Sequence, residues 1–233
     1  MSDEEAWKKT QNVVTWAREK GATVVLCLWG SNDNDVKGDG HGDGIIRHEA
    51  AARAMWKRVG ESFGNDEKVL FEAFNEPFGY TNPSKYMSAM RYITQDLPTN
   101  RVIIDGLGYA SDVQSIKNHW PGLLGYHVYP NWLPPGKRTQ SEYSTLVQHA
   151  LRGVGHRVFV TEFGAHLKRS DEDYENSGSS SHDVQFLKGM HDAFHVVKPR
   201  ATFLWHGWHN GDSYSLWGAS QSARSKVDRI QSY

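Results

Sequence analysis

The chain has 233 residues, a formal net charge of −1 and one cysteine. This length supports a full hydrophobic core, and we expect one domain over residues 1–233. Because basic and acidic side chains nearly cancel, neither nucleic acid nor an anionic membrane is an expected partner. The lone Cys27 rules out an internal disulfide and is predicted to be a small buried side chain. The sequence has no apolar run of membrane-spanning length, and MSDEEAWKK does not resemble a signal peptide, so localisation stays open.

Apolar strands alternate with amphipathic helices along the chain. A capping box at Ser2 predicts a first helix that ends near Gly21, and the strand TVVLCLWG follows. The remaining strands are predicted in KVLFEAFNE, RVIIDGLG, LLGYHVYP, RVFVTEFG and ATFLWHGW. Helices are predicted over about 45–63, from Asn82-Pro83 to about 97, and over about 139–151, 181–197 and 222–230. This alternation predicts a parallel α/β fold.

Polar and aromatic side chains gather where the predicted strands end. They are Trp29, Asn75 and Glu76, His127 and Tyr129, Glu162, and Trp205 and His206. Any single strand can end on a polar residue for structural reasons, but the repetition favours a site at the carboxyl ends of a (β/α) barrel. The two carboxylates in the set are three strand steps apart, which predicts that they face each other across the mouth.

Two facing carboxylates suit the cleavage of a glycosidic bond. One donates a proton to the leaving oxygen, and the other attacks or stabilises the anomeric carbon. Their mutual repulsion keeps one of them protonated. Pro77 predicts an extended backbone at Glu76. For Asn75 and Glu76 both to face the site, the strand must end or bulge there.

The segments FEAFNEP, YHVYP, VTEFG and FLWHGW, in this order, resemble glycoside hydrolase family 5 and its relatives, the retaining (β/α)8 cellulases and mannanases. The resemblance covers most of the chain from about residue 10. It implies that Glu76 is the acid/base and Glu162 the nucleophile. It also implies that Asn75 binds the sugar 2-hydroxyl and the nucleophile, and that Tyr129, paired with His127, supports the nucleophile.

The same resemblance implies a polysaccharide or oligosaccharide substrate and no cofactor. Trp205 matches the platform beneath the reacting sugar. We expect Trp29, Trp208 and His206 to make further substrate contacts, and we expect no metal ligand in the site. An open mouth lined by tryptophans suits a chain substrate.

The chain departs from the family at its beginning. If Glu76 follows strand four, only one strand precedes it, so strands one and two are absent. We therefore expect a partial TIM-type barrel of six parallel strands, equivalent to strands three to eight. The arginine that strand two places beside the nucleophile is lost, and Trp29 stands where the family usually has histidine. A smaller closure, the N-terminal helix or self-association would have to cover the open edges.

Further polar groups have structural or metal-binding interpretations. Residues 31–44, SNDNDVKGDGHGDG, resemble a calcium loop without its final glutamate, and a flexible polar loop is the favoured alternative. His191 and His195 are spaced as a metal pair but are expected to pack or face solvent. Glu72 is predicted to form a buried ion pair inside the barrel, and Asp105 to be structural.

The favoured hypothesis is a retaining hydrolase that cleaves internal β-1,4 bonds, most simply in a glucan. A mannanase or another β-glycanase of the family is the alternative within the same chemistry. A catalytically impaired carbohydrate-binding protein on an eroded barrel is the second class, and a metal-dependent hydrolase the third. Retention of both glutamates together with Asn75, His127 and Tyr129 favours the enzyme.

Overall fold

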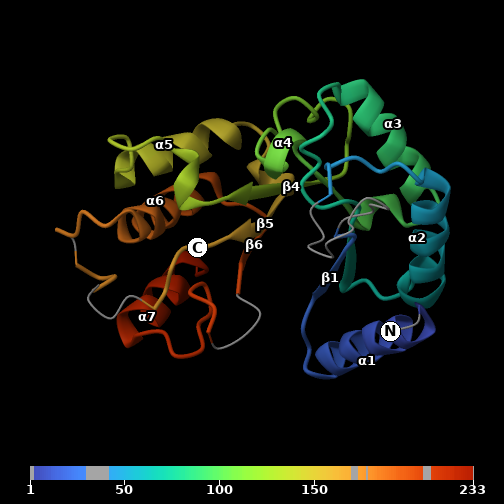
Figure 1. Ribbon diagram of the computed structural model, residues 1–233, viewed down its shortest axis with the longest axis horizontal. Helices are drawn as coiled ribbons and strands as arrows, with labels where there is room; N and C mark the ends of the chain where they lie inside the picture. The colour runs from blue at the N-terminus through green and yellow to red at the C-terminus, as the bar shows by residue number, and fades with distance from the viewer. Residues whose placement is uncertain (1–2, 30–41, 169–172, 177, 207–210, 233) are drawn as a thin grey trace.

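The computed structural model describes residues 3–29, 42–168, 173–176, 178–206 and 211–232 (Figure 1). Six parallel strands form one sheet in chain order, as the alternation predicts. They are β1 (Val24–Cys27), β2 (Val69–Glu72), β3 (Val102–Asp105), β4 (Leu123–Val128), β5 (Val158–Phe163) and β6 (Ala201–Leu204).

Helices pack on the outer face of this curved sheet (Figure 1). They are α1 (Asp3–Glu19), α2 (Glu49–Phe63), α3 (Pro83–Thr94), the short α4 (Leu107–Ala110), α5 (Gln140–Ala150), α6 (His182–Val197) and α7 (Gln221–Ile230). The Asn82 side chain caps α3 by accepting the Lys85 N–H, and Thr139 caps α5 through a capping box with Glu142. None of the helices in the described ranges is long and apolar enough to cross a membrane.

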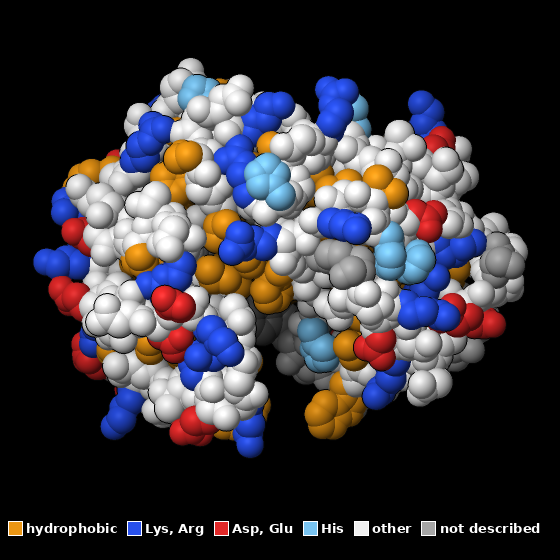
Figure 2. All heavy atoms as spheres, turned by 180° about the vertical axis from the view of Figure 1, so that it is seen from behind, with side chains coloured by type: hydrophobic (Ala, Val, Ile, Leu, Met, Phe, Trp, Pro, Cys, Tyr) orange, Lys and Arg blue, Asp and Glu red, His pale blue; other side chains and the backbone are white. Residues whose placement is uncertain are grey.

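The sheet is a partial barrel, which confirms the expected fold. Within the described residues, β1 and β6 each pair with one neighbour and not with each other. In Figure 1 the two ends of the arc, α1 with β1 and α7 with β6, lie apart. The space-filling view is hollowed between the two halves of the molecule, and both signs of charge are scattered over this face (Figure 2).

Inward-facing side chains form a small apolar layer across the strands. Its members are Leu70, Ile103, Leu123 and Phe159, with the partly buried Val25, Ala201 and Phe203 packed against them. Because side chains alternate along a strand, the positions two residues further on also face inward. On β1, β2 and β3 these positions are Cys27, Glu72 and Asp105, so polar groups lie above an apolar floor.

Two sequence expectations are wrong in detail. The helix expected from Ile45 begins at Glu49, because Asp43 accepts the Ile45 N–H and Tyr80 accepts the Ile46 N–H. Cys27 is exposed rather than buried. An inward position on an edge strand is covered only if further strands follow, and β1 has no neighbour on that side within the described chain.

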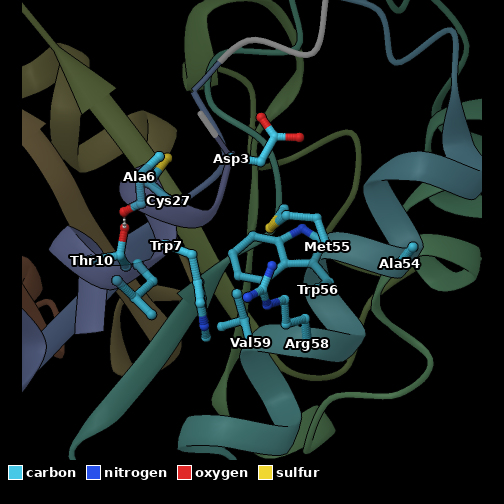
Figure 3. A pocket seen from close by; sticks show the side chains of 11 residues that line it. Asp3, Ala6, Trp7, Thr10, Cys27, Ala54, Met55, Trp56, Arg58 and Val59 are labelled. Atoms are coloured by element: carbon cyan, nitrogen blue, oxygen red, sulfur yellow. Dashed lines mark hydrogen bonds between the residues drawn. The ribbon is translucent and has the colours of Figure 1, made fainter. Parts of the chain in front are cut away.

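A pocket of about 540 Å³ lies between α1, β1 and α2 (Figure 3). Trp7, Met55, Trp56 and Val59 give it apolar walls, and Arg58 and Asp3 add charge. The pocket shows that α1 covers the edge of the sheet incompletely.

Candidate active site

The two predicted catalytic carboxylates meet at one histidine. Nδ1 of His127, on β4, lies 2.9 Å from Oε1 of Glu76 and 3.7 Å from Oε2 of Glu162. One carboxylate oxygen of each glutamate and a ring nitrogen of His127 all lie within 4.8 Å of one another. The strand ends therefore bring together the residues that the sequence singled out.

Tyr129 donates its hydroxyl to Oε2 of Glu162 at 2.5 Å. Glu162 is 6% exposed. Burial raises its pKa to about 7, although the charge of His127 and the Tyr129 hydrogen bond oppose the rise. In the described part of the chain, His127 is the basic group beside Glu162, and no lysine or arginine forms an ion pair with it.

A β-bulge explains how Glu162 reaches the site. Gly125 pairs with Phe159 and His127 with Glu162, so β5 carries one extra residue between these pairs. The inward-facing Phe159 makes Glu162 an outward position under strict alternation. The extra residue reverses the alternation and turns the carboxylate toward the mouth.

Glu76 lies beyond the end of β2, as does Asn75, which is 7% exposed. The expectation of an extended backbone at Glu76 is wrong, because its φ is +45°, in the left-handed region. The Glu76 N–H donates to Oδ2 of Asp105 at 3.1 Å, and its carbonyl accepts the Phe78 N–H at 2.7 Å. These two hydrogen bonds override the preference that proline imposes on the residue before it.

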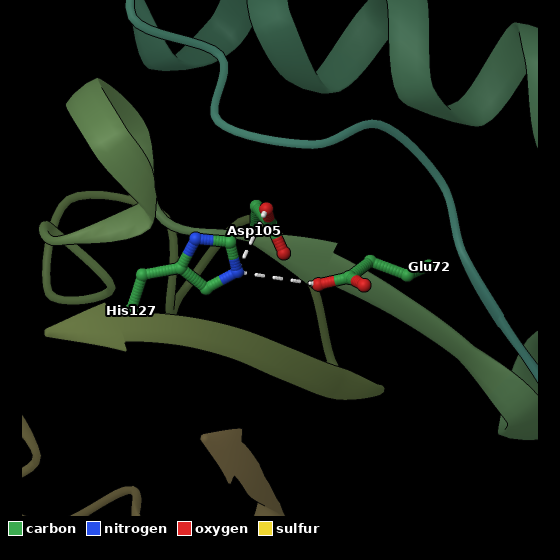
Figure 4. Close-up of side chains that lie close together, drawn as sticks. All are labelled: Glu72, Asp105 and His127. Carbon is green, nitrogen blue, oxygen red and sulfur yellow. Dashed lines mark ion pairs between the residues drawn. The ribbon is translucent and has the colours of Figure 1, made fainter. Parts of the chain in front are cut away.

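Beneath the catalytic pair lies a buried cluster of Glu72, Asp105 and His127 (Figure 4). Nε2 of His127 lies 3.6 Å from Glu72 and 3.8 Å from Asp105, and it is 3.0 Å from Oγ1 of Thr161. Burial alone would lower the pKa of His127, but the surrounding carboxylates raise it well above its ordinary value. Burial raises the pKa of Glu72, but His127, together with hydrogen bonds from Asp105 and Thr161, leaves it below its ordinary value. The predicted buried ion pair of Glu72 is thus present, with His127 as its partner.

Two sets of side chains have the spacing of metal ligands. They are Glu72 with Asp105 and His127, and Glu76 with His127 and Glu162. His127 belongs to both sets, and both its ring nitrogens already have hydrogen-bond partners in Glu76 and Thr161. The expected absence of a metal stays a prediction.

The structure describes some of the side chains predicted to contact substrate at the mouth, but not all of them. Trp29 follows β1 and Trp205 follows β6, and their rings stack with centroids 5.3 Å apart and planes at 21°. His206 is exposed. Trp208 and nearly all of the candidate calcium loop lie outside the described residues.

Sequence reasoning missed two contacts. It gave Asp105 no role at the site, although this side chain binds the Glu76 backbone. It did not consider Thr161, which contacts His127. The signal for Asp105 was a carboxylate inside the apolar run RVIID, at an inward position.

The family described as Cellulase (glycosyl hydrolase family 5) matches residues 1–213. The chain belongs to glycosyl hydrolase family 5. Endoglucanase H of Acetivibrio thermocellus is 30% identical to this family 5 chain in an alignment over 131 residues, which covers 52% of the chain and 14% of Endoglucanase H. The chain thus spans only a small part of that relative.

Solved structures of the same fold include XacCel5A in complex with cellopentaose, with a TM-score of 0.66 and 12% identity over 97% of this chain and 79% of that one. The endo-β-1,4-glucanase Xac0029 from Xanthomonas axonopodis pv. citri has a TM-score of 0.63 and 15% identity, over 98% of this chain and 79% of its own. At these identities the likeness shows the fold.

Proposed function

We propose that this family 5 chain is a retaining glycoside hydrolase that cleaves internal β-1,4 bonds of a polysaccharide by double displacement. Glu76 is the acid/base and Glu162 the nucleophile. One observation carries the proposal: a carboxylate oxygen of Glu76 and one of Glu162 lie within 4.8 Å of each other. Retaining enzymes hold their two carboxyl groups about 5–5.5 Å apart, whereas inverting enzymes leave about 6.5–9.5 Å for a water molecule.

The surrounding side chains fit these roles. In the first step Glu162 attacks the anomeric carbon while Glu76 protonates the leaving oxygen, and in the second Glu76 takes a proton from water as the glycosyl bond to Glu162 breaks. Tyr129 orients Glu162 through its hydroxyl. His127, whose pKa the surrounding carboxylates raise, donates Nδ1–H to one oxygen of Glu76 and leaves the other oxygen free for the proton in transit.

A β-1,4-glucan is the favoured substrate. XacCel5A, which shares the fold, was crystallised with cellopentaose. Aromatic rings at the mouth, with Trp205 as the sugar platform and Trp29 stacked on it, suit the flat faces of such a chain. Asn75, His206 and Trp208 are proposed as further contacts to the sugar.

The test is reducing-sugar release from soluble β-glucans, mannans and xylans by wild type, Glu76→Ala and Glu162→Ala. Exposed Glu61→Ala is the matched control. We expect activity on a glucan from wild type and the control, and loss of about 10⁴-fold or more in Glu162→Ala. Added azide should restore Glu162→Ala and give a glycosyl azide of inverted configuration.

The alternatives predict different results. Activity on mannan or xylan alone would change the substrate and keep the mechanism. Folded wild type that binds a glucan without cleaving it would refute the enzyme and support the carbohydrate-binding protein.

A further inference from the structure

Asp105 holds the backbone of the proposed acid/base. It ends β3, is fully buried and accepts the Glu76 N–H through Oδ2 at 3.1 Å. Its own carbonyl accepts the Tyr86 hydroxyl at 3.0 Å, which fixes the end of the strand. Because Glu76 has a φ of +45°, its conformation is unfavourable for a side chain with a Cβ and needs such contacts to persist.

The neighbouring strand makes room for this side chain. Asp105 pairs with Gly125 of β4, and a Cβ added at Gly125 would lie 2.0 Å from Oδ1 of Asp105. That distance is far below contact, so the carboxyl group occupies the space that a larger residue at 125 would fill. Gly125 and Asp105 thus form one arrangement across two strands.

Asp105 also lies close to a second buried carboxylate, that of Glu72. Oδ1 of Asp105 and Oε1 of Glu72 are buried and have no hydrogen-bond partner among the described residues. Glu72 is 5% exposed and Asp105 is not exposed at all. An oxygen of each lies within 4.8 Å of the other, so two ionised groups would repel across a dry space. A proton on Asp105 removes this repulsion.

The electrostatics agree with this placement of the proton. Burial and the charge of Glu72 raise the pKa of Asp105 well above its ordinary value. Glu72, by contrast, is held ionised by His127. The two carboxyl groups therefore differ in charge, because burial beside an ionised Glu72 favours the neutral form of Asp105.

We propose that Asp105 is a positioning residue for the acid/base: as a neutral carboxylic acid beside Glu72, it accepts the Glu76 N–H through Oδ2. This assignment rests on the proposed function of Glu76. Asp105 affects catalysis because, by fixing the backbone of Glu76, it directs the Glu76 carboxyl group at the leaving oxygen.

Asparagine separates this role from a charged one, because Asp105→Asn keeps an acceptor for the Glu76 N–H and carries no charge beside Glu72. The test compares kcat and KM of wild type, Asp105→Asn, Asp105→Ala and Gly125→Ala on an aryl cellobioside with a poor leaving group and on its 2,4-dinitrophenyl analogue. The dinitrophenyl group leaves without a proton. Asp183→Ala is the matched control, since Asp183 is 1% exposed and also accepts a backbone N–H, that of His166.

On the poor leaving group we expect kcat of Asp105→Asn and the control to stay within about threefold of wild type. Asp105→Ala and Gly125→Ala should lose about 100-fold in kcat with KM nearly unchanged, since general acid catalysis contributes about 10²–10⁴-fold. On the dinitrophenyl substrate their loss should be below about fivefold. Equal losses on both substrates, or Asp105→Asn as impaired as Asp105→Ala, would overturn the assignment.

A second readout is independent of turnover. In Asp105→Ala the amide proton of Glu76 should move upfield and exchange faster, whereas Asp105→Asn should keep both properties near wild type. If wild type hydrolyses neither substrate, the proposed function fails and this amide measurement decides the role of Asp105. An unchanged Glu76 amide in Asp105→Ala would refute it.

Discussion

Replacing the proposed nucleophile should stabilise the fold at alkaline pH. Burial raises the pKa of Glu162 from 4.5 to about 7. Below pH 4.5 the group is neutral in both the folded and unfolded chain. As pH rises toward 7 the unfolded chain releases this proton more readily, so the free energy of unfolding falls.

The size of the effect follows from the same interval. At 1.36 kcal/mol for each pH unit, a rise from 4.5 to about 7 corresponds to about 3.4 kcal/mol, of which about 2.5 kcal/mol falls between pH 5 and 8. Glu162→Gln keeps an acceptor for Tyr129 and cannot ionise. We therefore expect its unfolding free energy, relative to wild type, to increase by about 2.5 kcal/mol from pH 5 to pH 8.

Urea unfolding followed by circular dichroism at pH 5, 6, 7 and 8 measures this difference. Glu61→Gln is the control, because Glu61 is exposed and its replacement should leave the pH dependence of wild type intact. The reasoning is refuted if wild type and Glu162→Gln lose stability in parallel across this range. Active-site residues commonly lower the stability of the folded protein, and an ionised Glu162 would be one of them.

Other consequences concern turnover. The acid limb of kcat/KM should lie near pH 7, because Glu162 must be ionised to attack. A limb near pH 4.5 would contradict the raised pKa that burial gives Glu162. Tyr129→Phe should lower kcat/KM by about 10–100-fold and move that limb to higher pH, since the lost hydrogen bond favours the carboxylate; an unchanged pH profile would argue against the contact. Trp205→Ala should raise KM on a glucan about tenfold, a loss of about 1.4 kcal/mol in binding, and a larger effect on kcat than on KM would place the ring elsewhere. Incubation with EDTA should leave activity unchanged, because the proposed steps use only side chains, and inhibition reversed by added metal would show otherwise.

Much of the fold follows from local signals in the sequence. Asn82 and Thr139 cap their helices as predicted, because a capping side chain acts on amides two or three residues away. The six parallel strands and the meeting of Glu76 with Glu162 follow from alternation and from the common direction of the strand ends.

The remaining features depend on contacts between distant segments. The left-handed backbone of Glu76 needs Asp105, which lies 29 residues away, and Asp105 needs the missing side chain of Gly125. The turn of Glu162 toward the mouth needs the extra residue in β5, which alternation alone does not reveal. The prediction that Cys27 is buried was wrong, because burial of a side chain on the edge strand β1 requires a further neighbouring strand.

The stacked indoles of Trp29 and Trp205 give the partial barrel an optical signature. They follow the two edge strands, and with centroids 5.3 Å apart their electronic transitions mix. Such coupling splits the ultraviolet circular dichroism band into lobes of opposite sign, and a single Trp29→Phe change would abolish the couplet. The separation of the two sheet edges therefore becomes measurable in solution, without substrate or added label, and any polypeptide or sugar that parts the rings would register as loss of the signal.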